Sequence, residues 1–194
     1  MAIDFGQITR TSDRARLLAL GLALAVVGVT ACSSSSDAVT VESDSAGMTG
    51  METNMGDPDA VPAYDIADAD IREGELVVLD TRPPGYDGVT GRAFMARHAA
   101  GTTVTIEISG LQPGEEFIAH VHEGACAEAG GAHFKFEAGG SDMPPNEIHL
   151  LFTSASDGTG FMTAENEGVA GEDARSVVVH PLDLIDNKIA CAEL

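Results

Sequence analysis

Two histidines that are one residue apart could bind a single metal ion. His120 and His122 flank Val121 at the end of an apolar stretch that begins at Phe117. In a β-strand, residues i and i+2 project from the same face, so both imidazoles would point the same way. Imidazole is a ligand of both zinc and copper, but a lone pair with this spacing is a weak signal.

Two further histidines strengthen the prediction of a metal site. His133 lies in a short Gly-rich segment, and His180 ends the apolar run 177–179. Four imidazoles from three segments suit Cu(II), which favours nitrogen ligands in a tetragonal arrangement. Zinc accepts the same ligands, so ligand type alone leaves the metal open.

The elements that must position these histidines are short apolar or alternating stretches, separated by Gly, Pro, Asp and Asn. They are 76–79, 91–95, 103–108, 117–121, 148–153, 160–164, 176–180 and 188–192. None has a helical period, and each has the length of a strand. The pattern predicts an all-β fold, an antiparallel, immunoglobulin-like β-sandwich with Greek-key connections.

The N-terminus has the pattern of an export signal. Arg10, Arg14 and Arg16 precede an uncharged, largely apolar run over 17–31, which is too short to span a membrane comfortably. The run ends in small residues before Cys32, and this resembles the bacterial lipobox, which implies lipidation of that cysteine. We expect residues 1–31 to be a signal peptide and the protein to be anchored by lipid at the cell envelope, on a periplasmic or extracellular face.

A low-complexity segment follows the predicted lipid anchor. Residues 32–71 are rich in Ser, Asp, Gly and Met and contain no Lys or Arg, so we expect a disordered linker before a folded domain over 72–194. Thioether sulfurs of Met48, Met51 and Met55 could bind Cu(I), although three flexible methionines in a linker are the simpler interpretation.

Charge and cysteine content limit the partners and the compartment. Without residues 1–31 the chain has 7 basic and 29 acidic residues, a net charge of −22. This acidity excludes nucleic acid and anionic membrane surfaces as partners.

Apart from Cys32, the cysteines are an even pair, Cys126 and Cys191. In an exported protein we expect them to form a disulfide.

The histidine and cysteine segments together resemble the copper/zinc superoxide dismutases. The matching segments are 117–126, 131–134, 177–180 and 188–191, in the same order and with similar spacing, over residues 90–194. The resemblance implies the same β-sandwich. It also implies that His120, His122, His133 and His180 bind copper, that His133 would bridge to zinc in a complete member, and that Cys126 and Cys191 are the disulfide pair.

The family's zinc site is incomplete in this sequence. His149 matches one zinc ligand, but the positions of another histidine and of the aspartate are occupied by Ser141 and Phe152. Asp142 or Glu147 could substitute, but a site with copper alone, in which His149 is a vestige, is the favoured interpretation, and zinc is doubtful.

The resemblance implies that the protein is an enzyme that converts superoxide to oxygen and hydrogen peroxide. The family places an arginine that attracts superoxide where this sequence has Lys188, which keeps the charge but loses the planar fork. His133 would deliver a proton. The alternative is a non-catalytic module that binds or delivers copper at the envelope. The sequence leaves open whether the protein is a monomer or a homodimer.

Overall fold

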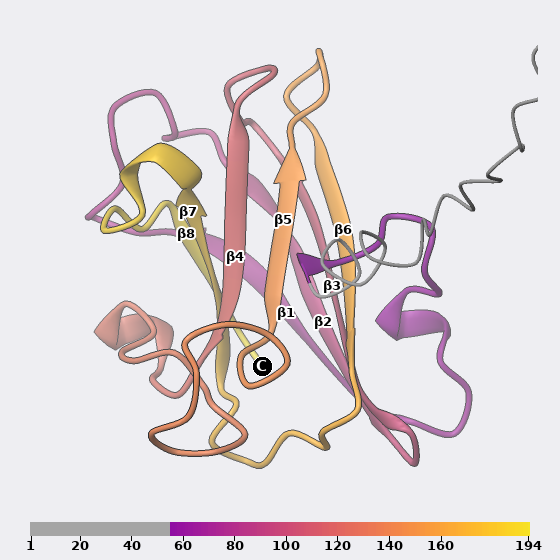
Figure 1. Cartoon of the computed structure of the whole chain (residues 1–194). Coiled ribbons are helices and arrows are strands. Elements are labelled where there is room, and N and C mark those ends of the chain that lie inside the picture. Colours follow the sequence, from indigo (N-terminus) through magenta and orange to yellow (C-terminus); the bar gives the residue numbers. More distant parts are fainter. Residues whose placement is uncertain (1–54) are drawn as a thin grey trace, which may run out of the picture. The chain divides into compact units, whose positions relative to one another are not determined.

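Eight β-strands form the framework of residues 55–194, the part of the chain that the computed structural model describes (Figure 1). The strands are β1 (Asp70–Val78), β2 (Thr90–His98), β3 (Gly101–Ser109), β4 (Glu116–His122), β5 (His149–Thr153), β6 (Gly160–Asn166), β7 (Ser176–Pro181) and β8 (Ala190–Glu193). Three short 3-10 turns lie wholly within these residues, namely η2 (Ala63–Asp65), η3 (Cys126–Glu128) and η4 (Leu182–Leu184). Every predicted stretch overlaps one of these strands, so the predicted all-β class is confirmed.

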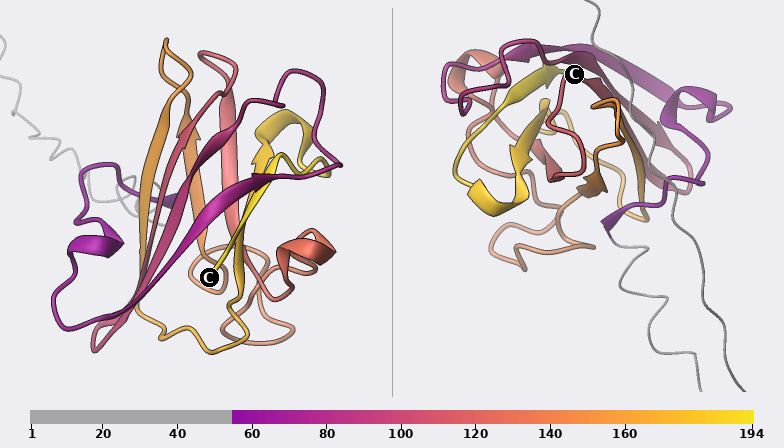
Figure 2. Two further views of the ribbon diagram at one scale, coloured as in Figure 1. Left: turned by 180° about the vertical axis from the view of Figure 1, so that it is seen from behind. Right: turned by 90° about the horizontal axis from the view of Figure 1, so that it is seen from above.

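All strand pairs are antiparallel, in the order β5-β4-β7-β8-β1-β2-β3-β6. The first part of β1, 70–75, pairs with β2, and its last part, 76–78, pairs with β8. Seen from behind, β1 therefore joins the two halves of the sandwich (Figure 2). Because β3 pairs with β6 and β4 with β7, the chain crosses repeatedly between the halves, as the predicted Greek-key connections require.

The alternation of side chains along β4 separates the core from the metal-binding candidates. Phe117, Ala119 and Val121 point into the main hydrophobic core. Residues one position later, including His120 and His122, therefore project from the opposite, outer face of the sheet. Both histidines are nonetheless buried, since the long loop 123–148 covers this face.

The predicted linker over 32–71 is wrong for its last part, because residues 55–69 pack against the sheet and β1 begins at Asp70. Ala63 is fully buried with Phe94 and Ala96 in a second, small apolar cluster. The ring of Tyr64 packs edge-on against Phe94, with 4.9 Å between ring centroids. The composition resembles a linker, but a few apolar side chains suffice to hold it on the outer face of β2.

The predictions for the N-terminus lie outside the described residues. These are the signal peptide 1–31, the lipidated Cys32, the linker up to residue 54, and Met48 and Met51. Over residues 55–194 no helix is both long and apolar enough to cross a membrane.

Candidate metal centre

Four histidines meet on the outer face of β4. His120 and His122 come from β4, His180 comes from the end of β7, and His133 comes from loop 123–148. Antiparallel pairing places His180 opposite Ile118, and a single β-bridge joins His133 to His122. One nitrogen from each of the four rings lies within 4.8 Å of the other three. The four residues singled out by sequence are thus brought together.

Three buried nitrogens in this cluster have no hydrogen-bond partner. They are Nδ1 of His120, Nε2 of His122 and Nε2 of His180. A buried polar atom without a partner costs about 1–3 kcal/mol, so folded proteins rarely retain one without a purpose. Nitrogens that bind one ion at about 2 Å lie no more than about 4 Å apart across it. The observed separations fit a metal ion after a small closure of the site.

The other ring nitrogens of two of these histidines are fixed by the backbone. Nδ1 of His122 lies 3.2 Å from the carbonyl oxygen of Gly131, and Nδ1 of His180 lies 2.6 Å from that of Ile185. A ring that donates its Nδ1–H to a carbonyl keeps the lone pair on Nε2. These contacts therefore select the tautomer in which Nε2 is free to bind a metal.

Burial keeps three of the four rings neutral. Desolvation, followed by repulsion from His133 and Lys188, lowers the pKa of His122 to about 3. Desolvation also lowers the pKa of His180 to about 4, and it lowers that of His120 further, with the neighbouring histidines adding to the effect. Neutral imidazole is the form that binds metal, so the site is prepared for an ion at neutral pH.

His133 is positioned by its neighbour and by a carboxylate. Phe134 inserts into the core and its N–H donates to the carbonyl of Val121, which turns His133 outward to the cluster. Nδ1 of His133 lies 2.8 Å from Oε2 of Glu147. Nε2 is therefore the nitrogen that remains for a metal ion shared with the other three histidines. The His133 side chain is also 32% exposed, unlike the other three.

A second group of possible ligands adjoins the first. It consists of His133, Glu147 and His149. One oxygen of Glu147 lies between the two rings, 2.8 Å from His133 and 2.9 Å from Nε2 of His149. Three donors are one fewer than a structural zinc site uses. The other candidate substitute, Asp142, is instead paired with Lys135.

Glu147 has a more specific position than its sequence suggested. It was singled out only as a possible zinc ligand, yet its carboxylate is 2% exposed and already bridges two histidines. The available signal was its spacing, since Glu147 lies two residues before His149, the first residue of β5, and the two side chains meet on the same side. Lys135, whose ammonium lies 3.7 Å from Glu147, was not predicted to belong to this site.

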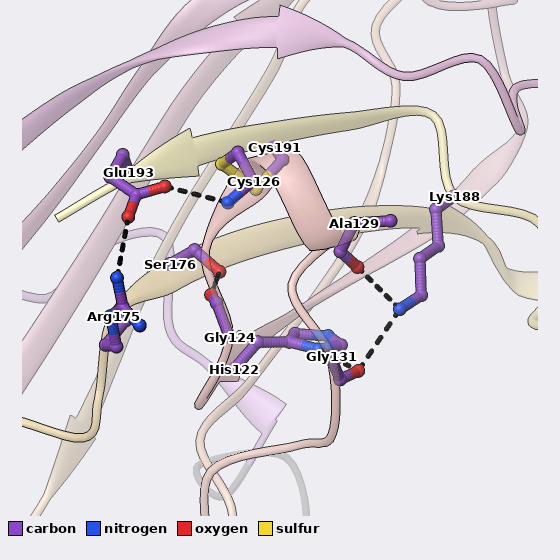
Figure 3. Close-up of a disulfide and its surroundings, with 10 residues drawn as sticks. All are labelled: His122, Gly124, Cys126, Ala129, Gly131, Arg175, Ser176, Lys188, Cys191 and Glu193. Atoms are coloured by element: carbon purple, nitrogen blue, oxygen red, sulfur yellow. Dashed lines mark hydrogen bonds and ion pairs between the residues drawn. A yellow bond between two sulfur atoms is a disulfide. The ribbon is translucent and has the colours of Figure 1, made fainter.

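A disulfide holds loop 123–148 against β8. Cys126 and Cys191 are bonded and lie 65 positions apart in sequence, and the predicted pair is confirmed (Figure 3). The hydroxyl of Ser176 on β7 donates to the carbonyl of Gly124. Gly130 has φ of +77°, and a Cβ atom there would lie 2.5 Å from the Val178 side chain and 3.1 Å from the ring of His122. The loop can therefore approach His122 closely only because this residue is glycine.

Lys188 lies beside the loop that contains His133. Its ammonium donates to the carbonyl oxygens of Ala129, at 2.6 Å, and Gly131, at 3.2 Å (Figure 3). Partial burial lowers the pKa of Lys188 below its usual value. Two of the three ammonium protons are used by these carbonyls, which leaves one for another acceptor. The carbonyl oxygen of Gly131 that accepts from Lys188 also lies 3.2 Å from Nδ1 of His122, which places the ammonium next to the cluster.

The fold and the site together define an antiparallel β-sandwich with a histidine cluster suited to a metal ion. Solved structures similar to this chain bear the name of the family that its motifs resemble. One is a Cu/Zn superoxide dismutase from Brucella abortus, with a TM-score of 0.48 and 17% identity over 64% of this chain and 99% of that one. A SOD-like protein from Bacillus subtilis has a TM-score of 0.45 and 18% identity over 63% and 97% of the two chains. A point mutant of a SOD-like protein from the same organism has a TM-score of 0.45 and 17% identity over 63% and 96%. No family model and no curated protein matches the chain.

Proposed function

We propose that this protein is an exported superoxide dismutase that uses copper alone. The observation that carries the proposal is the cluster of His120, His122, His133 and His180, in which nitrogens of four rings lie within 4.8 Å of one another. Three of these rings present a buried nitrogen without a partner. An all-nitrogen site of this kind suits copper.

The reaction consumes two superoxide ions and two protons and yields dioxygen and hydrogen peroxide. Bound copper would supply the one-electron chemistry, by accepting an electron from one superoxide and donating it to the next. The residues of the chain bind the metal and orient the substrate. His133 is the exposed ring of the cluster, so its Nε2, when it is not bound to the metal, would take a proton from solvent and pass it to the reduced substrate.

Glu147 takes over the positioning of His133 that zinc would otherwise provide. It accepts a hydrogen bond from Nδ1 of His133 and another from His149, which fixes the protons on those two nitrogens. His149 is accordingly part of the support of the copper site. In this proposal the protein needs no zinc.

Lys188 supplies the positive charge for the anionic substrate. Its ammonium is fixed beside loop 123–148 by two carbonyls and retains one proton to donate to superoxide. An ammonium is a point charge without the bidentate geometry of a guanidinium, so orientation of the substrate is weaker than an arginine would give.

The compartment is part of the proposal. The signal-like N-terminus and the lipobox-like residues before Cys32 favour export and lipid anchoring at the cell envelope. The disulfide between Cys126 and Cys191 is consistent with an oxidising compartment.

The test compares metal content with turnover. The full-length protein is stripped of metal and reloaded with copper alone or with copper and zinc, and superoxide decay is followed by stopped flow. We expect fast turnover with copper alone, no gain from zinc, and loss of both copper and turnover in His120→Ala. His98→Ala is the matched control, because His98 lies on β2 and contacts Thr103. Stoichiometric copper without turnover would overturn the proposal in favour of a copper-binding or copper-delivery module.

A further inference from the structure

A cavity of about 520 Å³ opens beside the histidine cluster, on the side of Glu147. Its lining includes His120, His133, His149 and Glu147, and also two methionines, Met55 and Met143. The cavity therefore connects solvent with two of the proposed copper ligands. In its wall, thioethers and imidazoles of the cluster line the same space.

These two methionines differ from the others that the structure describes. Met95 and Met162 are buried in the hydrophobic core, where a thioether serves as an apolar side chain. Met143 is 49% exposed, and Met55, the first of the described residues, is half-buried. Core packing therefore explains neither Met55 nor Met143, and both lie at the same cavity.

Backbone contacts hold both methionines at the cavity. The N–H of Asp57 donates to the carbonyl of Thr163 on β6, at 2.7 Å, which ties the segment after Met55 to the sheet. The carbonyl of Met143 accepts from the N–H of Asn146, at 3.1 Å, and from that of Glu147, at 3.4 Å. The turn that presents Met143 is thus the one that presents Glu147.

The charge at this cavity favours a cation. Asp142 and Glu147 contribute two carboxylates to the lining, and Lys135 contributes one ammonium that is paired with both. The chain as a whole has a net charge of −21. A positive ion is attracted to this opening, whereas an anion is repelled.

Thioether sulfur selects Cu(I) among the biological metal ions, because the sulfur is a soft ligand and Cu(I) is a soft ion. We propose that Met55 and Met143 form a capture site for Cu(I), from which the ion passes to His120 and His133. The transfer is an exchange of ligands, sulfur for nitrogen, with no change in oxidation state. This inference rests on the proposed function in one respect, namely that the histidine cluster is the destination of the metal.

The first test measures copper loading separately from catalysis. Apo full-length protein is mixed with Cu(I) held by a chromophoric chelator, and transfer is followed by stopped flow. We expect the double variant Met55→Leu, Met143→Leu to slow loading by roughly tenfold, because Cu(I) is no longer held close to the histidine ligands. The final copper content and the turnover of the loaded enzyme should be unchanged. Met48→Leu with Met51→Leu is the matched control and should load at the normal rate.

The second test detects the site without copper chemistry. Ag(I) is a soft, redox-inert substitute for Cu(I), and methyl-labelled methionines report its binding by NMR. We expect the methyl signals of Met55 and Met143 to shift on titration with Ag(I), in the wild type and also in His120→Ala. A shift in His120→Ala would establish the capture site even if the loaded protein proved inactive. Unchanged loading by the Met55/Met143 variant, or signals that do not move, would overturn the inference.

Discussion

Oε2 of Glu147 lies 2.8 Å from Nδ1 of His133, and the same oxygen lies 2.9 Å from Nε2 of His149. Both rings are thereby oriented by a single buried carboxylate. A charged acceptor forms hydrogen bonds about twice as strong as a neutral one, and its burial strengthens them further. Glu147 therefore controls the direction in which His133 presents its remaining nitrogen to the cluster.

Replacing this carboxylate should weaken copper binding. Glu147→Gln keeps the volume but removes the charge, so one of the two histidine contacts loses its acceptor or weakens. We expect the Cu(II) affinity to fall by about 10–100-fold, as for other residues that orient metal ligands. A competition titration gives the affinity, and electron paramagnetic resonance of bound Cu(II) reports the ligand geometry.

Asp142→Asn provides the comparison for this variant. Asp142 is 84% exposed and contacts Lys135, so its loss should change neither the affinity nor the spectrum appreciably. If Glu147→Gln gave an unaltered Cu(II) spectrum, Glu147 would be a packing residue and not a positioning one.

The lowered histidine pKa values predict an acid-sensitive apo protein. An unfolded histidine takes up a proton near pH 6.5, whereas folded His180 does so only near pH 4 and folded His122 near pH 3. Below pH 6.5 the unfolded state binds more protons, so the free energy of unfolding falls by up to about 1.4 kcal/mol per pH unit for each residue. For each histidine, the free energy of unfolding stops falling once the pH is below the pKa of that residue in the folded state.

Urea unfolding of the apo protein at pH 7 and pH 5 would measure this dependence. His180→Asn removes one titrating group while its amide can still donate to the carbonyl of Ile185. The variant should lose about 2 kcal/mol less than the wild type over this interval. Because both proteins share all carboxylates, the comparison cancels their effect. Equal losses would show that His180 is not kept neutral by the fold.

The sequence predicted the strands and the histidine cluster because both follow from local rules. Alternation of core and outward residues around Val121 placed His120 and His122 on one face, and the apolar run 177–179 placed His180 at the end of a neighbouring strand. The bridge formed by Glu147 depends on how loop 123–148 folds back, which no local pattern specifies. The disulfide was predictable because the cysteines left after Cys32 were a single pair.

The segment 55–69 was mistaken for linker because its packing is tertiary. Its apolar residues are few, and Ala63 is buried only against Phe94 and Ala96 from β2. A chain that begins at residue 70 would expose this cluster and lose the edge-on contact of Tyr64 with Phe94. We expect its free energy of unfolding to be about 2–3 kcal/mol lower than that of a chain beginning at residue 55.

Chemical denaturation of the two shortened chains would check this expectation. Removal of residues 1–54 alone serves as the control and should leave the stability of the sandwich unchanged. Equal midpoints for chains that begin at 55 and at 70 would mean that the segment adds nothing to the fold.

Lys188 should govern how turnover depends on salt. With a net charge of −21, the protein as a whole repels superoxide, and only a local positive charge beside the site opposes this repulsion. The screening length falls from about 30 Å at 0.01 M salt to about 8 Å at 0.15 M, so added salt removes the distant repulsion before it weakens the nearby attraction. We therefore expect the rate constant of the wild type to rise over this interval.

Lys188→Gln should be slower at every salt concentration and show a steeper rise, whereas Lys188→Arg should remain close to the wild type because it keeps the charge. Stopped-flow decay of superoxide at several salt concentrations gives the slopes. Copper affinity must be measured in parallel, since Lys188 also donates to Ala129 and Gly131 and thereby supports the loop that contains His133. A variant that binds copper normally but loses turnover identifies guidance of the anion as the role of Lys188. Loss of copper in proportion to turnover would instead show that its two carbonyl contacts serve only to hold the loop.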